Sequence, residues 1–312
     1  MQYSNNNHHP STNAPYAATI GFFDGVHRGH QYLISRLREE AAASGMQSMV
    51  ITFDRHPREV LGSNYQPRML STPEEKLFRL SQTGIDRCEV LSFTPELASL
   101  TAREFMQQVL KDKLNVAKLY IGYDNRFGHN REEGFDDYVR YGREMGIEVI
   151  HSDAFQLNKV NISSSVVRSF VSEGEVEFAN RCLGYIYTVT GKVVGGVKEG
   201  RKMGFPTANI EPDDARKLIP APGVYAVLVH VEGSGQQLQG MMNIGTRPTF
   251  GENKLSLETH ILHFSEDIYG KLLTISFIKR LRAEQRFSSA SELREQLILD
   301  EQEVERIFSA KK

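Results

Sequence analysis

The sequence predicts an α/β domain with a doubly wound parallel sheet, followed by an antiparallel β-barrel that a C-terminal helix closes. In the first half, apolar strand-like runs alternate with helix-like segments, a rhythm typical of a parallel sheet with helices on both faces. After residue 184, runs of β-branched and aromatic residues follow one another with only Gly-, Pro- and Ser-rich turns between them, which favours a barrel. We therefore predict a disordered polar tail over residues 1–15, a first domain over 16–183 and a second over 184–312.

The strands of the first half are expected at residues 17–23, 48–54, 88–93, 118–123 and 148–152. A helix is expected from residue 31 to about 46, because apolar side chains recur there at helical spacing. Two more helices should begin at Thr72 and Thr101, since a glutamate three residues later completes a capping box in each case. Ligands of such sheets bind outside the carboxyl ends of the strands, so residues that follow a strand are candidate site residues.

The strands of the second half are expected at residues 187–194, 224–231, 238–243, 257–264 and 273–279. No long helix-like segment separates them, and this absence distinguishes the second half from the first. The closing helix should run from residue 290 to about 308, with Ser289 and Glu292 forming a capping box at its start.

Composition excludes several classes of protein. The 37 basic and 39 acidic residues balance, and no basic run dominates any segment, so we expect no nucleic-acid partner. Cys88 and Cys182 are the only cysteines; they fit neither a disulfide framework nor a zinc site, and we expect both to be inert packing residues. No apolar run approaches the ~20 residues of a membrane span, and the N-terminus lacks a signal-peptide core. These features predict a cytoplasmic protein that does not act at a membrane.

The first strand leads into a glycine-spaced turn that carries two histidines. Residues 21–30 read Gly-Phe-Phe-Asp-Gly-Val-His-Arg-Gly-His. The glycines permit a tight turn and a close approach to a ligand, and the N–H groups of the following helix point at the same place. A nucleotide phosphate is the expected anion. The alternative, a helix start with two solvated imidazoles, is disfavoured by the three glycines and the preceding strand.

The second half contains another glycine-rich segment, residues 200–209, which read Gly-Arg-Lys-Met-Gly-Phe-Pro-Thr-Ala-Asn. The glycines make a loop able to fold over phosphates, and the proline stiffens its exit. The Thr207 hydroxyl and the Asn209 side-chain carbonyl are hard oxygen donors suited to Mg²⁺ that bridges ATP phosphates. A glycine-rich basic loop alone would often be only a hairpin; the Pro-Thr-Ala-Asn continuation makes the pattern specific.

These motifs resemble two enzyme families. Residues 21–30 are similar to the His-x-Gly-His signature of nucleotidyltransferases and, in full, to the adenylyltransferase module of bacterial FAD synthetases. Residues 52–57, 122–128 and 162–168 match the same module in order, and residues 200–209 resemble the riboflavin kinase motif. The resemblance covers nearly the whole chain from about residue 17. It implies a bifunctional enzyme that converts riboflavin and ATP to FMN, then FMN and ATP to FAD and pyrophosphate, both with Mg²⁺.

For adenylyl transfer, the resemblance implies that His27 and His30 donate to the ATP phosphates while Arg168 neutralises the leaving pyrophosphate. It also implies a set of nucleotide- and phosphate-binding residues: Gly21, Phe22, Asp24, Gly25, Ser164 and Ser165. Asp124 and Asn125 are expected near the flavin phosphate or the adenine. Asn125 stands where many relatives carry an aromatic residue, and Ser165 stands where threonine is usual.

For riboflavin phosphorylation, the resemblance makes Glu258 the catalytic base that accepts the proton of the ribityl hydroxyl. In a regular strand Glu258 shares a face with Leu262 and Phe264, where a carboxylate is costly unless it is paired or used; a salt-bridged strand residue is the alternative. Arg282, in the segment 280–284, is expected in a flap near the flavin. The resemblance further assigns phosphate-binding residues of the loop, Gly200, Arg201 and Gly204, and metal ligands, Thr207 and Asn209.

Two other interpretations stay open at this point. The chain could be an enzyme that has kept one of the two activities, or a flavin-binding regulator without turnover. The intact histidine pair, Arg168 and Glu258 argue against the regulator, because binding alone would not need them. The sequence makes no prediction of oligomeric state.

Overall fold

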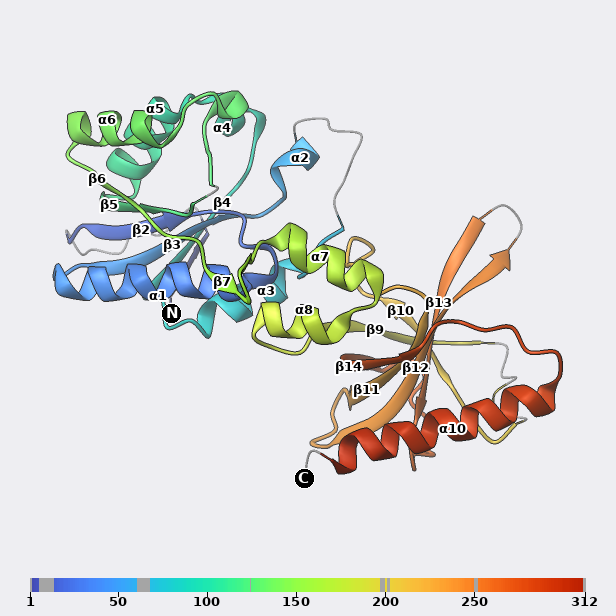
Figure 1. The fold of residues 1–312 in the computed structure, drawn as a ribbon. Helices are drawn as coiled ribbons and strands as arrows, with labels where there is room; N and C mark the ends of the chain where they lie inside the picture. The colour runs from blue at the N-terminus through green and yellow to red at the C-terminus, as the bar shows by residue number, and fades with distance from the viewer. Residues whose placement is uncertain are drawn as a thin grey trace. The chain divides into compact units, whose positions relative to one another are not determined.

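The computed structural model describes residues 2–5, 14–60, 68–123, 125–196, 200, 203–249 and 252–310. The chain divides into two compact units, Met1–Ser164 and Ser165–Lys312, which are described separately below (Figure 1). None of the helices in these described ranges combines the length and the apolar character that a membrane span requires.

The first unit is built on a six-stranded parallel sheet in the order β1-β4-β3-β2-β5-β6. Its strands are β1 (Gln2–Asn5), β2 (Tyr16–Ile20), β3 (Gln47–Phe53), β4 (Arg87–Leu91), β5 (Val116–Ile121) and β6 (Glu148–His151). The five predicted strands are confirmed. The order runs outward from β2 to β4 and then returns to β5, so the sheet changes direction between β2 and β5. A small antiparallel pair, β7 (Gln156–Leu157) and β8 (Val160–Asn161), follows β6.

Helices cover both faces of this sheet, which confirms the doubly wound class. They are α1 (Arg28–Ala43), α2 (Pro57–Val60), α3 (Pro73–Ser81), α4 (Pro95–Ser99), α5 (Ala102–Glu104), the π-helix η2 (Phe105–Lys113) and α6 (Phe135–Met145), with short 3₁₀ turns η1 (Asp24–Val26) and η3 (His129–Arg131). Alternate strand residues serve opposite faces: Ala17 and Val50 pack with α1, whereas Ala18 and Ile51 pack with η2 and α6.

The helix starts show how well local signals predict structure. Both expected capping boxes form, at Thr72 and Thr101. Helix α1 begins three residues earlier than predicted because the side chain of His27 accepts a hydrogen bond from the His30 backbone N–H and so caps the helix. Both histidines therefore belong to the start of α1.

The N-terminal tail differs from expectation. Residues 2–5, which we predicted to be disordered, form the edge strand β1 and pair in parallel with β4. Strand pairing uses main-chain N–H and C=O groups, which every non-proline residue carries, so a polar segment can extend a sheet edge without an apolar side-chain pattern.

The second unit is a closed antiparallel barrel preceded by two helices. Helix α7 (Ser164–Glu173) starts at the last residue of the first unit, and α8 (Val176–Leu183) follows it. The barrel order is β10-β13-β12-β11-β14-β9, with strands β9 (Thr188–Val194), β10 (Ala208–Pro212), β11 (Gly223–Val231), β12 (Gln237–Thr249), β13 (Glu252–Ile261) and β14 (Leu272–Arg282). The barrel and its five predicted strands are confirmed; β10 was missed because its first residues belong to the glycine-rich motif.

The closing helix α10 (Ala290–Ser309) is confirmed (Figure 1). Its residues Val304 and Phe308 pack in one apolar cluster with barrel residues such as Val224 and Met241. Its cap differs in one detail. Ser289 accepts a hydrogen bond from the Glu292 N–H, as in a capping box, but the Glu292 carboxylate accepts from the N–H and hydroxyl of Ser288. The reciprocal bond is therefore displaced by one residue.

Helix α8 is tied to the barrel by Asn180. Its side-chain N–H donates to the Phe277 carbonyl at 2.8 Å, and its side-chain oxygen accepts from the Tyr187 N–H at 2.7 Å. Arg280 of β14 also reaches back and donates to the Glu173 carbonyl at 3.1 Å. The segment between residues 165 and 183 is thus bonded to barrel strands.

Both cysteines are buried and neither forms a disulfide. Cys88 lies in β4 beneath α1, and burial raises the pKa of its thiol to about 12. Cys88 is therefore protonated at neutral pH and packs as a small apolar side chain.

Candidate functional sites

The histidine turn follows the central strand of the first unit. All five residues of β2 are buried, and β2 pairs with β3 on one side and β5 on the other. Because the strand order reverses between β2 and β5, their carboxyl ends border the crevice where doubly wound sheets bind ligands. The Gly21 N–H continues the sheet by donating to the Ile51 carbonyl at 3.0 Å, and the chain then turns into α1.

His27 and His30 lie against each other at the start of α1. The Nδ1 atom of His27 accepts a hydrogen bond from the His30 backbone N–H at 3.3 Å, so a neutral His27 carries its proton on Nε2. The two imidazole rings stack with centroids 3.6 Å apart. Burial, and after it the proximity of His27, hold the pKa of His30 well below its usual value. A bound phosphate would oppose both effects and favour the protonated, hydrogen-bond-donating ring.

The predicted nucleotide contacts Asp24 and Gly25 have other partners in the structure. The buried Asp24 carboxylate accepts hydrogen bonds from the N–H groups of Leu70, at 3.0 and 3.1 Å, and Ser71, at 3.1 Å. The Gly25 N–H donates to the Ser71 hydroxyl at 3.0 Å. These bonds tie the histidine turn to the segment that leads into α3. A carboxylate repels phosphate, whereas as an acceptor of N–H bonds it can fix the turn.

Residues 162–164 lie against the other side of the turn. The Ser164 hydroxyl donates to the Asp24 carbonyl at 3.0 Å. A Cβ atom on Gly29 would lie 2.9 Å from the Ile162 carbonyl oxygen and 3.1 Å from the His27 ring, so this approach requires glycine. The structure therefore brings Ser164 and the histidine pair together.

Side chains at or just beyond the carboxyl ends of β3 and β5 complete this site. His56 meets the Phe22 ring edge-on at 4.8 Å between centroids, and the Thr52 hydroxyl donates to the Phe22 carbonyl at 3.1 Å. Asn125, predicted to contact the flavin, donates its side-chain amide to the Ile20 carbonyl and so holds the end of β2. Asp124 lies outside the described residues.

Ser165 and Arg168 belong to helix α7 in the second unit. The Arg168 Nη1 atom donates to the Ser165 hydroxyl at 3.5 Å, one helical turn away. The phosphate-binding roles of both residues remain predictions.

In the barrel unit, a cavity of about 310 Å³ is lined by strand residues and by α10. Its polar lining residues are Thr207, Asn243, Glu258, His260, Arg282, Glu284 and Gln285. Its apolar lining residues are Met203, Phe205, Val224, Met241, Phe287, Leu293 and Leu297. Apolar walls with a few polar groups are what an aromatic ligand with a polar chain requires.

Glu258 owes its surroundings to strand register. It pairs with Asn209 on β10 and with Asn243 on β12, so these three side chains form a row across three strands. Asn243 was not among the predicted site residues, although it lies in the cavity beside Glu258. Its pairing joins segments distant in the sequence, so the sequence pattern gave no signal for it.

The glycine-rich loop is closed by main-chain and side-chain bonds. The Phe205 N–H donates to the Gly200 carbonyl at 2.9 Å, and a Cβ atom on Gly200 would lie 2.3 Å from the Phe205 carbonyl oxygen. Gly204 adopts a positive φ of 89°. The buried His260, two residues after Glu258, donates from Nδ1 to the Pro206 carbonyl at 2.8 Å and thereby fastens the loop exit to β13. Arg201 lies outside the described residues.

Arg282 lines the cavity but is committed to an ion pair. Its guanidinium donates to the Asp300 carboxylate of α10 from Nε, at 3.0 and 3.1 Å, and from Nη2, at 2.7 Å. The buried Asp300 also accepts from Gln296 at 2.9 Å. Predicted as a flavin contact, Arg282 in this structure joins the end of β14 to α10.

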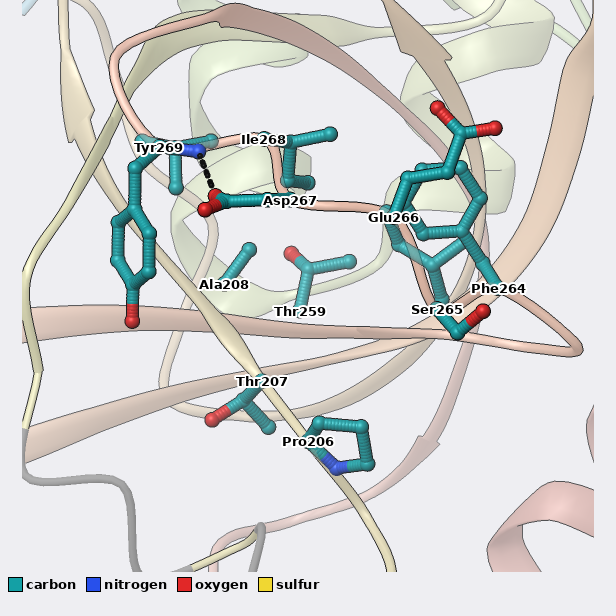
Figure 2. A pocket seen from close by; sticks show the side chains of 12 residues that line it. Pro206, Thr207, Ala208, Thr259, Phe264, Ser265, Glu266, Asp267, Ile268 and Tyr269 are labelled. Carbon is teal, nitrogen blue, oxygen red and sulfur yellow. Dashed lines mark hydrogen bonds between the residues drawn. The ribbon is translucent and has the colours of Figure 1, made fainter.

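A second cavity, of about 520 Å³, adjoins the first at Thr207, which lines both. Figure 2 shows the loop 264–269 on one side of this cavity and Pro206 and Thr207 on the other. The Tyr269 N–H donates to the Asp267 carboxylate at 3.0 Å, which fixes the turn of this loop.

Strand β13 separates the two cavities. Glu258 and His260 line the smaller cavity, whereas Thr259 and Ile261 line the larger, because successive strand residues point to opposite faces. Leu262 packs with the apolar cluster beneath α10, but Phe264 lines the larger cavity instead of sharing a face with Glu258. The strand ends at Ile261 and the next residues turn, so the expected alternation does not extend to Phe264.

Comparison with known proteins shows similarity in both units. The FAD synthetase family matches residues 9–166, and the riboflavin kinase family matches residues 183–308. A bifunctional riboflavin kinase/FMN adenylyltransferase from Pseudomonas fluorescens is 39% identical over 278 residues, 89% of this chain and 88% of the relative. The Escherichia coli K12 protein of the same description is 38% identical, covering 94% and 93% of the two chains, and that of Bacillus subtilis 168 is 36% identical, covering 93% and 92%.

Among solved structures, one described as a macrolide-efflux protein from Streptococcus pneumoniae matches this chain with a TM-score of 0.85. The two sequences are 32% identical, and the match covers 94% of each chain. The two proteins therefore share a fold.

Proposed function

We propose roles for individual residues in two reactions, starting from the family of the chain. The chain belongs to the bifunctional riboflavin kinase/FMN adenylyltransferases. The FAD synthetase region lies in the N-terminal part and the riboflavin kinase region in the C-terminal part. The enzyme transfers the γ-phosphoryl group of ATP to riboflavin and the adenylyl group of ATP to FMN. The observation that carries the assignment is that each family region contains its own site: the histidine turn in one, and the Glu258 cavity in the other.

In adenylyl transfer, a phosphate oxygen of FMN attacks the α-phosphorus of ATP and the bond to pyrophosphate breaks. Two polyanions must meet, so catalysis depends on positioning and on positive charge more than on a covalent intermediate. His27 presents an Nε2 proton toward phosphate, because its Nδ1 already accepts from the helix backbone. His30 becomes a donor at both nitrogens when phosphate restores its proton. Arg168 neutralises the pyrophosphate that leaves.

In the kinase reaction, we assign riboflavin to the smaller cavity and ATP to the larger one. The apolar walls of the smaller cavity suit the isoalloxazine ring, and Glu258 lies among its polar groups. Thr207 lines both cavities, so ATP in the larger cavity would bring its γ-phosphate to the boundary at Thr207. This arrangement lets the two substrates approach from opposite sides of β13.

Glu258 is the proposed general base. The ribityl 5′-hydroxyl oxygen attacks the γ-phosphorus, its proton passes to the Glu258 carboxylate, and the bond from the γ-phosphorus to ADP breaks. The amide of Asn243, next to Glu258 in the cross-strand row, is suited to orient the hydroxyl or the carboxylate. His260 holds the glycine-rich loop in place over the phosphates through Pro206.

The residues at the loop exit fit a magnesium ion. The Thr207 hydroxyl and Asn209 amide carbonyl are hard oxygen donors, and Asn209 pairs directly with Glu258 across the strands. When bound with ATP, Mg²⁺ would neutralise phosphate charge. Thr207 and Asn209 would hold it, while the residues above bind and orient the substrates. We further propose a cytoplasmic location, where ATP is supplied, and no role for nucleic acid or membrane in either reaction.

One incubation tests this proposal. The purified protein is mixed with riboflavin, ATP and Mg²⁺, and the flavins are separated by chromatography over time. We expect FMN to appear first and FAD to follow. If FMN appears without FAD, the protein has only the kinase activity. If riboflavin stays unchanged, the result favours a flavin-binding regulator instead.

A further inference from the structure

A buried lysine lies beside the histidine turn but is not among the residues to which a role is assigned above. Lys76, in the first turn of α3, is only 4% exposed. Its ammonium group donates to the Phe53 carbonyl, the last of β3, at 2.8 Å and lies 4.1 Å from the centroid of the Phe22 ring. Lys76 thus joins three segments that border the adenylyltransferase site: the histidine turn, the carboxyl end of β3 and the start of α3.

Burying this charge needs an explanation. Among the residues that the structure describes, no carboxylate lies within ion-pair distance of the Lys76 ammonium; its contacts are a carbonyl and an aromatic face. A charged group taken out of water without a charged partner costs free energy, and an apolar side chain of similar length could fill the same space without that cost. A positive charge at the carboxyl ends of β2 and β3 would, however, attract the phosphates of ATP and FMN.

We propose that Lys76 is a positioning residue for adenylyl transfer, whose ammonium holds Phe22 and the end of β3 in place where the phosphates bind. The proposal rests on the adenylyltransferase site described above. The surrounding bonds support it, because the same α3 start is tied to the turn by Asp24, through Leu70 and Ser71. Loss of Lys76 would leave that tether intact and release only the Phe22 side of the turn.

The charge of Lys76 makes the proposal testable by pH. Desolvation lowers the pKa of Lys76 to about 8, and the nearby carboxylates of Asp24 and Asp54 oppose this shift only in part. Asp24 belongs to η1, Asp54 follows β3, and the neutral thiol of Cys88 lies in β4; His56 packs edge-on against the same Phe22 ring that Lys76 contacts. The ammonium form predominates below this pKa, so adenylyl transfer should decline as pH rises through about 8.

The test uses the full-length enzyme with supplied FMN and ATP, and scores FAD by chromatography from pH 6.5 to 9.5. We expect Lys76→Met to lower kcat/KM for FMN adenylylation about 10- to 100-fold, the usual effect of a small misplacement in a site that depends on positioning. Riboflavin phosphorylation by the same protein should stay within about twofold and serves as the internal reference. Lys76→Arg should recover most of the activity and lose the decline above pH 8, because arginine stays protonated.

The matched control is Lys118→Met. Lys118 also carries a partly buried ammonium in the same unit, but it pairs with Glu40 at 2.7 Å and Glu148 at 3.1 Å near the start of β5. The Lys118→Met variant should carry out adenylyl transfer at the wild-type rate and with the wild-type pH profile. Arginine could fail to fit the buried site, in which case circular dichroism would show that Lys76→Arg is unfolded. The pH profile of Lys76→Met then tests the proposal, since its residual activity should show no decline above pH 8.

Three results would overturn the inference while the wild type makes FAD: wild-type rates in Lys76→Met, a decline above pH 8 that persists in the variants, or activity lost only in proportion to unfolded protein. A wild-type enzyme that makes no FAD from FMN would instead refute the proposed adenylyltransferase function.

Discussion

In the α/β unit the paired histidines come from one ten-residue turn, whereas in the barrel the surroundings of Glu258 come from three strands. The turn is held by bonds from its own helix cap, from residues 70–71 and from Ser164. Glu258 instead stands between Asn209 and Asn243 because of strand register. The first site therefore depends on separate hydrogen bonds, each of which a single substitution can remove. The second site depends on strand register, and a change of register would move all three side chains together.

The sharpest way to break this comparison is Glu258→Gln, which keeps the shape of the row and removes the proton acceptor. Kinase turnover should fall by roughly two to four orders of magnitude, the usual contribution of general base catalysis. Substrate binding, measured by titration, should change little because the lost interaction acts in the transition state. Adenylylation of supplied FMN should continue at the wild-type rate. Weaker binding and a lower Tm with only a modest loss of turnover would make Glu258 a structural residue.

His30→Ala tests the other unit. FAD formation from supplied FMN should fall by about two to three orders of magnitude, the usual cost of losing a preorganised donor to developing charge. Riboflavin phosphorylation should remain near normal, because the histidine turn lies in the other unit. Both activities are measured on one preparation whose fold is checked by circular dichroism. An equal loss of both would contradict the assignment of the histidine turn to adenylyl transfer alone.

Two fragments sharpen the boundary between the units. We expect residues 183–312 to fold and phosphorylate riboflavin, but to be less stable than residues 165–312. The longer fragment keeps the three hydrogen bonds made by Asn180 and Glu173, at about 1 kcal/mol each, so its free energy of unfolding should be about 3 kcal/mol higher. Urea titration measures the difference. Equal stabilities would show that α7 and α8 contribute nothing to the barrel, and an insoluble or inactive pair would argue against an independent kinase domain.

The smallest effect expected is that of His260→Ala, which frees the Pro206 carbonyl from β13. The kcat/KM for riboflavin phosphorylation should drop about tenfold, which corresponds to one neutral hydrogen bond of about 1.4 kcal/mol. His260→Asn, which keeps a side-chain N–H donor close to the position of Nδ1, should recover part of this loss in steady-state assays. Wild-type kinetics in His260→Ala would mean that the loop holds its position without this bond.

Local patterns predicted the fold class, most of the strands and the capping boxes at Thr72 and Thr101, because capping boxes and strand periodicity depend on neighbouring residues. They missed β1 and β10 and the cap that His27 provides. They also marked the histidine turn and the glycine-rich loop. They could not show that the carboxylate of Asp24 bonds to residues 70–71, that Arg282 pairs with Asp300, or that Asn243 lies beside Glu258, since each contact joins distant segments. One feature of the sequence does indicate that Lys76 is buried. Lys76 precedes the buried Leu80 by four residues and therefore lies on the apolar face of α3.

The alternation of side chains along β13 has a consequence for engineering substrate preference. Under the proposed assignment, substitutions at 258 or 260 alter the flavin side, and those at 259 or 261 alter the nucleotide side. Variants that accept another nucleoside triphosphate could therefore be sought at Thr259 and Ile261 without touching the flavin cavity. Deleting one residue from the strand ahead of Glu258 would exchange the two sets and present the carboxylate to the wrong substrate. We therefore expect β13 to tolerate substitutions at these positions but not the insertion or deletion of a residue.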